Sequence, residues 1–201
     1  DKIFWWTLLG ASVSHLLAWL ISGTFLELPW LISVVIICGF LAWKCLPVAM
    51  LLAFTEIFVG GHGHLFDALV LDFNLSLRSA IFIGVMVGFF LGVIMHRHSI
   101  KFSLGRDLAW LLIVIAVIIG TIIGATHNSL SLVFNDANGY MVIGYLLPII
   151  SISWNNDLKR SLLQVFAASV AWISVMTLSL SYLFNHLPGL WLDSLYKFVR
   201  D

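Results

Sequence analysis

Apolar segments long enough to cross a lipid bilayer are the feature that most constrains this chain. The apolar residues Ala, Val, Ile, Leu, Met, Phe, Trp, Tyr and Cys together fill 61% of its 201 positions. Only 10% of the positions are charged, against about 25% in soluble domains. A soluble fold of this composition would lack the polar residues for its surface. The sequence therefore predicts an all-α integral membrane protein, a single polytopic bundle of transmembrane helices.

Seven apolar segments are expected to cross the bilayer, since a crossing takes about 20 apolar residues, or fewer where the bilayer thins locally. The stretch from Pro29 to Gly61 would be about 50 Å long as one helix, too long for a core of about 30 Å. We expect it to fold back between Trp43 and Pro47, because Lys44 would be costly at mid-membrane and the proline removes a helical donor. The predicted spans are Phe4 to Ile21, Pro29 to Trp43, Leu46 to Gly60, Leu77 to Met95, Leu108 to Ala125, Gly139 to Ser153 and Ser161 to Phe184.

The distribution of charge favours a cytoplasmic N-terminus. This orientation leaves only Arg78, Lys197 and Arg200 among the basic residues on the outer side, which satisfies the positive-inside rule. The basic residues predicted to be cytoplasmic are Lys2, Lys44, Arg97, Lys101, Arg106, Lys159 and Arg160. The net charge is zero, so nothing favours binding to nucleic acid.

Residues 187–201 differ in pattern from the transmembrane bundle predicted for residues 1–186. Apolar side chains between Trp191 and Val199 fall on one helical face and polar ones on another, which predicts an amphipathic helix lying on the outer leaflet. Such a helix commonly introduces an extramembrane loop. Because the chain also begins at Asp1 rather than Met, we expect both ends to be cut from a longer protein.

Glu56 and Arg78 are the leading functional candidates. Glu56 falls in the last turn of the third predicted span, where an ionised carboxylate is costly unless paired or reached by water. Arg78 opens the fourth span, and its guanidinium can grip a phosphate or carboxylate through two hydrogen bonds. A cation at a helix N-terminus opposes the macrodipole, so Glu56, Asp72 or a bound diphosphate is expected to compensate it. A substrate-binding role and a structural ion pair both stay open.

The loop from Gly60 to Asp67 places His62 and His64 two residues apart on the outer side. A metal site is one interpretation, but histidine metal ligands usually come in larger sets, and no cysteine is near. We therefore predict no metal and a re-entrant turn shaped by glycines. In such a turn, neutral imidazoles would donate hydrogen bonds to a substrate.

Three further polar groups have open or structural interpretations. Asp136 and Asn138 precede the sixth span, where either one caps the helix by accepting its free amide protons or both form a substrate-facing cluster. His15 lies in the middle of the first span, where a neutral hydrogen bond to another helix accounts for it. The stretch from His96 to His98 is expected to contact lipid phosphates and to anchor the topology.

Several classes of protein lack support in the sequence. It contains no Gly-x-Ser-x-Gly, no His-Glu-x-x-His, no Walker loop and no cysteine-histidine set, which argues against serine proteolysis, zinc hydrolysis and ATP-driven transport. No internal repeat is evident between the halves, and the spans are expected to be unbroken, unlike those of many secondary transporters.

Four stretches carry a resemblance to a known family. Glu56 to Phe66 and Leu75 to Phe82 resemble the early part of bacterial O-antigen ligase and polymerase-like membrane proteins. Asp136 to Tyr140, with Pro148, is similar to the family's Asp-x-Asn entry to a middle span. Leu195 to Asp201 is similar to the start of the family's large periplasmic loop.

The resemblance implies an inverting glycosyltransferase of the bacterial inner membrane that builds cell-envelope polysaccharide such as lipopolysaccharide. Such an enzyme moves an oligosaccharide from undecaprenyl diphosphate to lipid A core or another acceptor, and it needs no metal, nucleotide or other cofactor. Arginines neutralise the departing diphosphate, and a base on the periplasmic loop activates the acceptor hydroxyl. Arg78 would be one such arginine, and Arg200 would begin the loop that holds others. The expected base lies beyond Asp201, so these residues alone would be inactive.

The favoured hypothesis therefore places an outward substrate site near Arg78. The residues expected to line it are Glu56, His62, His64, Arg78, Asp136, Asn138 and Arg200. Two alternatives from other classes are a transporter or flippase for an anionic lipid or solute, and a scaffold without chemistry. An enzyme should continue beyond Asp201 into a polar loop rich in Arg and His, and a transporter into more spans.

Overall fold

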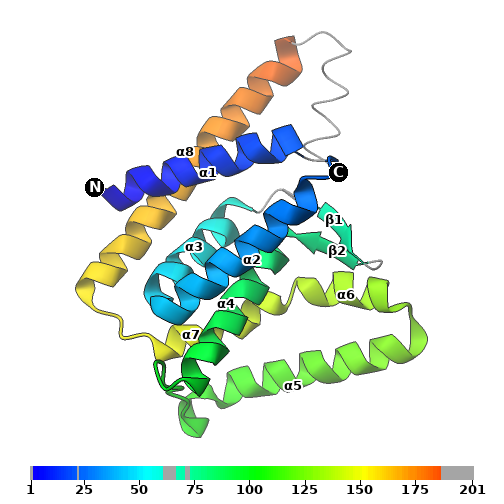
Figure 1. The fold of residues 1–201 in the computed structure, drawn as a ribbon, viewed down its shortest axis with the longest axis vertical. Helices are drawn as coiled ribbons and strands as arrows, with labels where there is room; N and C mark the ends of the chain where they lie inside the picture. Colours follow the sequence, from blue (N-terminus) through cyan, green and yellow to red (C-terminus); the bar gives the residue numbers. More distant parts are fainter. Residues whose placement is uncertain (1, 22, 61–66, 71–72, 187–201) are drawn as a thin grey trace.

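The protein is largely helical. The computed structural model describes residues 2–21, 23–60, 67–70 and 73–186. Within these residues the elements are α1 (Lys2–Ile21), α2 (Glu27–Lys44), α3 (Leu46–Val59), β1 (Asp67–Val70), β2 (Phe73–Ser76), α4 (Leu77–Ile94), α5 (Leu104–His127), α6 (Leu130–Asn138), the 3-10 helix η1 (Met141–Tyr145), α7 (Leu146–Ser151) and α8 (Asn156–His186). Figure 1 shows their arrangement.

Five of the described helices are long and apolar enough to cross a membrane. They are α1, α2, α4, the part of α5 from Asp107 to His127, and α8. Their boundaries follow five of the seven predicted spans closely. The two remaining spans correspond to shorter apolar pieces, namely α3 and the segment from Met141 to Ser151. The prediction of an all-α membrane protein with several apolar helices is thus confirmed at this level.

Helices α2 and α4 pack with their backbones in near contact at the centre of the bundle. A Cβ atom on Gly84 of α4 would lie 2.5 Å from the carbonyl oxygen of Val35. One on Gly88 would overlap the carbonyl oxygen of Gly39 and lie 2.8 Å from Ala42 Cβ. Small residues four apart allow such an approach, which maximises packing where lipid supplies no hydrophobic drive. Sequence reasoning missed this glycine stripe.

The connection from α2 to α3 confirms the predicted fold-back. Helix α2 ends at Lys44, and α3 begins at Leu46 with Pro47 in its first turn, where a proline costs no hydrogen bond. Because α3 returns along the bundle, α2 and α4 run in the same direction (Figure 1). Phe89 and Met50 lie fully buried between these three helices.

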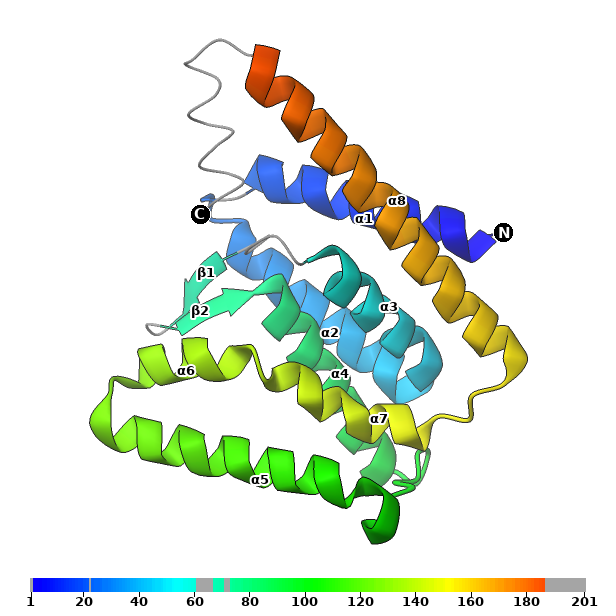
Figure 2. The same ribbon diagram turned by 180° about the vertical axis from the view of Figure 1, so that it is seen from behind.

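Helix α1 joins the bundle through α8. The two helices cross each other in both ribbon views (Figures 1 and 2), and α8 also packs on α3. Nε1 of Trp172 in α8 lies 3.2 Å from Nδ1 of His15, and the two rings meet edge-on with centroids 5.4 Å apart. The same Nδ1 lies 2.9 Å from the carbonyl oxygen of Ala11, so it either donates within α1 or accepts from Trp172. The predicted contact of His15 with another helix is confirmed.

The predicted sixth span, from Gly139 to Ser153, corresponds to a shorter apolar helical segment from Met141 to Ser151. The chain forms α6 within the predicted outer loop and then η1 and α7, which are three short helices in succession. Gly144 lies so close to α4 that a Cβ there would be 2.9 Å from the ring of Phe82. Pro148 lies in the first turn of α7, where the missing amide proton costs no hydrogen bond. The 3-10 stretch η1 therefore lies where the chain packs on α4, and it passes directly into α7.

Helices α5 and α6 form an arm at one side of the molecule (Figures 1 and 2). Trp110 Nε1 donates a hydrogen bond to the carbonyl oxygen of Ile143 in η1, 2.9 Å away, and so links the base of α5 to the bundle. From Leu108 to His127 no residue is buried. An apolar helix with this much exposure is suited to lipid rather than water.

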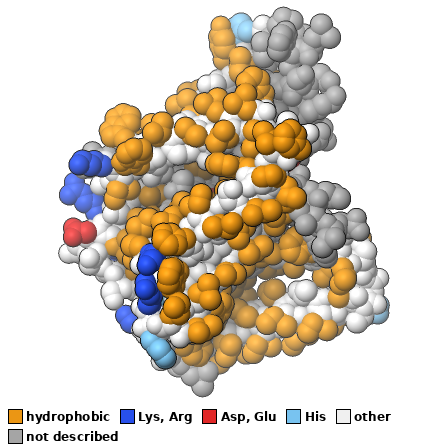
Figure 3. Space-filling view, in the orientation of Figure 1, with side chains coloured by type: hydrophobic (Ala, Val, Ile, Leu, Met, Phe, Trp, Pro, Cys, Tyr) orange, Lys and Arg blue, Asp and Glu red, His pale blue; other side chains and the backbone are white. Residues whose placement is uncertain are grey.

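The molecular surface is mainly apolar in the view of Figure 3. Side chains such as Ile94 and Leu178, each 71% exposed, belong to this apolar surface. The Lys and Arg side chains visible there gather on the side where α4 ends and α8 begins (Figures 1 and 3). The amphipathic helix predicted over residues 187–201 lies outside the described residues.

The glycine contact gives a test of the packing. Gly88→Ala should lower the free energy of unfolding by about 1–3 kcal/mol, because its methyl group has to displace backbone of α2. Gly120→Ala is the matched control, since nothing lies within 4 Å of that position, and alanine should leave stability unchanged or raise it slightly. Thermal unfolding of the two variants in one detergent measures the difference. Equal melting temperatures would contradict the described α2–α4 contact.

Candidate functional site

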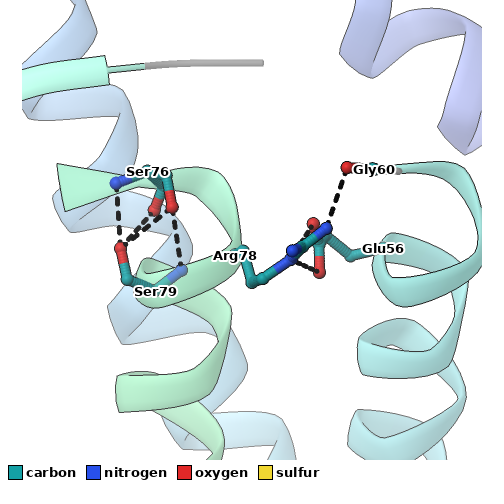
Figure 4. A network of polar contacts seen from close by, with 5 residues as sticks. All are labelled: Glu56, Gly60, Ser76, Arg78 and Ser79. Carbon is teal, nitrogen blue, oxygen red and sulfur yellow. Dashed lines mark hydrogen bonds and ion pairs between the residues drawn. The ribbon is translucent and has the colours of Figure 1, made fainter. Parts of the chain in front are cut away.

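A hairpin and a helix cap position Arg78 at one end of the bundle. Strands β1 and β2 pair antiparallel, and β2 leads directly into α4. Ser76 caps α4: its Oγ accepts from the amide of Ser79 at 3.3 Å, while Ser79 Oγ accepts from the amide of Ser76 at 2.8 Å. Reciprocal bonds of this kind satisfy free amide groups and fix where a helix begins. Arg78 is thereby held in the first turn of α4 (Figure 4).

The guanidinium of Arg78 bridges from α4 to the end of α3. Its Nε lies 3.2 Å from Oε1 and 3.4 Å from Oε2 of Glu56. Its Nη2 donates to the carbonyl oxygen of Gly60, 2.8 Å away. Figure 4 shows the side chain crossing between the two helices. Of the three anions expected to compensate Arg78, the structure thus brings Glu56 into contact with it.

Gly60 is required for this arrangement on steric grounds. A Cβ atom at this position would overlap the Glu56 carboxylate and lie 2.8 Å from the Glu56 carbonyl oxygen. The φ angle of Gly60 is −77°, so its conformation is open to any residue. The glycine is therefore explained by space: the absence of a side chain lets the carboxylate fold back over the end of α3.

The pair is asymmetric in its exposure. The side chain of Glu56 is 9% exposed, and that of Arg78 is 33% exposed. Charge-assisted hydrogen bonds of a buried carboxylate offset the cost of removing it from water. Among the described residues, Nη1 of Arg78 has no hydrogen-bond partner. Arg78 is thus anchored through two of its nitrogens while a third donor group stays available to an anionic oxygen.

Tyr145 joins this region although sequence reasoning passed over it. It ends η1, is 3% exposed, and its ring meets the ring of Phe82 edge-on with centroids 5.1 Å apart. It belongs to the same buried cluster as Leu77 and Ala80, which flank Arg78 in the first turn of α4. The glycine directly before it, Gly144, marks a close approach to α4 and was the signal that could have revealed it.

Asp136 and Asn138 lie elsewhere than expected. Both are in the last turn of α6, so the prediction that one of them caps the helix of the sixth span is wrong. Asp136 is exposed. The Oδ1 atom of Asn138 is buried without a hydrogen-bond partner in the described chain. Helix α6 packs beside β2, but no hydrogen bond among the described residues joins either side chain to Arg78.

The remaining predicted site residues, His62, His64 and Arg200, lie outside the described residues. Across residues 2–21, 23–60, 67–70 and 73–186, no three His, Cys, Asp or Glu side chains lie close enough together to hold a metal ion. Comparison of the chain with protein-family models, with curated proteins and with solved structures gives no match.

The exposure of the pair leads to a stability prediction. Arg78→Met should cost about 2 kcal/mol, less than the roughly 3–5 kcal/mol typical of a fully buried pair, because it leaves the Glu56 carboxylate without its partner. The double variant Glu56→Gln/Arg78→Met should recover part of that loss, since an amide is less costly to bury than a charge. Thermal unfolding of the wild type, the two single variants and the double variant completes a double-mutant cycle, which measures the interaction energy between the two side chains. Additive losses would contradict a direct interaction.

Proposed function

We propose that this chain is the membrane-embedded part of a lipid-linked glycan transferase of the O-antigen ligase or polymerase type, in the inner membrane of a bacterium. The observation that carries the proposal is the anchored, one-third exposed guanidinium of Arg78 at the end of the bundle. A donor fixed by Glu56 and Gly60 keeps its orientation before a ligand arrives. Pre-organised donors of this kind stabilise charge that develops in a transition state.

The proposal includes the topology. With the N-terminus in the cytoplasm and α3 counted as a crossing, the β1–β2 hairpin and Arg78 face the periplasm. The gathering of Lys and Arg side chains at the opposite end of α4 supports this orientation (Figure 3). The segment formed by η1 and α7 then makes up the sixth membrane element, which does not cross as a continuous helix.

Arg78 has a defined role in this scheme. When an oligosaccharide leaves its undecaprenyl carrier, negative charge grows on the diphosphate oxygen that is released. A hydrogen bond from Nη1 of Arg78 would stabilise that charge in the departing group. Glu56 prevents the guanidinium from turning away and partly neutralises it, so the carrier can also be released.

A transporter or flippase for an anionic lipid or solute is the second candidate. It is favoured by the interruption between α6 and α7, because discontinuous helices beside a polar group are typical of substrate sites in transporters. Tyr145 and Arg78 would then form part of a translocation path. The two candidates differ in whether a glycosyl bond is broken or a solute crosses the membrane intact.

The test is a comparison of Arg78→Ala with Arg78→Lys in the full-length protein of its own host. Arg78→Ala should reduce polymeric surface glycan on a gel by about tenfold or more, while membrane insertion stays normal. Arg78→Lys should give a partial defect, since lysine retains the charge but cannot reproduce the two anchored nitrogens.

A normal glycan ladder in cells that carry Arg78→Ala would refute the transferase. Accumulation of undecaprenyl diphosphate-linked glycan on the periplasmic side would support it, because the donor is delivered but not used. Accumulation on the cytoplasmic side would instead identify a flippase.

A further inference from the structure

A second charged site lies at the other end of α2 and α4, away from Arg78. Arg97 Cζ lies 4.5 Å from the ring centroid of Trp43, and Lys44 Nζ lies 4.4 Å from the same centroid. Two cations therefore rest against one indole. We propose that Trp43, Lys44 and Arg97 bind the headgroup phosphate of an anionic phospholipid.

The backbone around Arg97 is held in place by several hydrogen bonds. His96 adopts a left-handed conformation with φ 57°, which turns the chain back over the end of α4. The amides of Arg97 and His98 then both donate to the carbonyl oxygen of Gly92, at 2.8 and 3.1 Å. This is the usual way in which a helix C-terminus satisfies its free carbonyls. Arg97 is consequently positioned by a closed turn.

His98 ties this turn to α2. Its Nε2 donates to the carbonyl oxygen of Ala42 at 2.9 Å, and its ring stacks on Phe89 with an interplanar angle of 12°. A Cβ at Gly92 would overlap the imidazole, so the glycine stripe of α4 also makes room for His98. The sequence predicted that the whole cluster from His96 to His98 contacts lipid. His98 instead points into the bundle, so the prediction stays open only for His96 and Arg97.

The local charge is uncompensated within the described chain. No carboxylate among the described residues forms an ion pair with Lys44 or Arg97. Helix dipoles favour a cation at the C-terminal end of each helix, but they do not explain why two cations contact the same ring. An anion bound near both side chains would gain from both charges.

Two observations identify the anion as a lipid headgroup. The indole N–H of Trp43 is buried and has no hydrogen-bond partner among the described residues, so it is an unmet donor beside the two cations, and a phosphate or ester oxygen that displaces a covering side chain would satisfy it. The surface that adjoins the cations on α2 and α4 is apolar and exposed, which suits acyl chains. Its exposed side chains are Ile36, Ile37, Phe40, Ile94 and Met95.

The experiment uses the full chain in mixed micelles that contain equal amounts of phosphatidylglycerol and phosphatidylcholine. Native mass spectrometry measures the ratio of the two lipids retained by the protein. The wild-type chain should retain phosphatidylglycerol preferentially, and Arg97→Gln should lower the ratio about fivefold, the loss expected for one basic side chain near an anionic lipid. Lys159→Gln, which removes an exposed cation at the start of α8, should leave the ratio unchanged.

Two further variants keep the test decisive. If Arg97→Gln does not fold, Lys44→Gln makes the same comparison from α2. Trp43→Phe retains a ring for the cations but removes the N–H, and should lower the ratio by less than Arg97→Gln does.

Three outcomes would overturn the proposal. Equal losses in Arg97→Gln and Lys159→Gln would show only general attraction between a basic surface and acidic lipid. An unchanged ratio in both Arg97→Gln and Lys44→Gln would show that the cations bind no lipid. Displacement of phosphatidylglycerol by millimolar inorganic phosphate would show a site for the free ion instead.

Discussion

The near contact between the backbones of α2 and α4 is the constraint on which the other features depend. In lipid, two apolar helices gain nothing from leaving water, so their association relies on close packing. Glycines at positions 84 and 88 of α4 provide a flat surface, against which Gly39 and Ala42 of α2 fit. Because this contact is made by backbone atoms, it allows little freedom in how far one helix is displaced along the other.

Both charged clusters are built on the two ends of this helix pair. At one end, the serine cap of α4 directs Arg78 toward Glu56 on the neighbouring α3. At the other end, the turn after α4 brings Arg97 against Trp43 of α2. Each cluster includes a position where a glycine leaves room for a polar side chain, Gly60 for the carboxylate and Gly92 for the imidazole. Glycines therefore do two things in this fold: they let the helices pack closely, and they leave room for polar side chains at the ends of the helices.

The parts of the fold that depend on residues close together along the chain could be predicted from the sequence. The fold-back at Lys44 and Pro47 follows from the cost of a lysine within a bilayer and from proline geometry, and the boundaries of α4 follow from polar residues on either side. The pairing of Glu56 with Arg78 could be anticipated only as one of three alternatives, because choosing among them requires knowing that α3 and α4 are neighbours.

Other features depend on tertiary contacts and could not be read from local patterns. The 3-10 stretch η1 lies where Gly144 packs against Phe82, a residue far away in the sequence. The contact of Tyr145 with Phe82 has the same cause. The β1–β2 hairpin was missed because each of its strands is only four residues long, too short to show a clear alternating pattern. The glycine stripe was visible in the sequence, but its partner on α2 was not.

The tight register of α2 and α4 limits how this molecule can move. Displacing α4 by one helical turn would carry it about 5.4 Å along its axis, which would break the 2.8 Å bond of Arg78 at one end and the 2.9 Å bond of His98 at the other. The α2–α4 pair is therefore the fixed part of the molecule. Any opening that admits a lipid-sized ligand has to come from the arm formed by α5 and α6, which an indole hydrogen bond links to η1, or from the α1–α8 layer, which packs on α3.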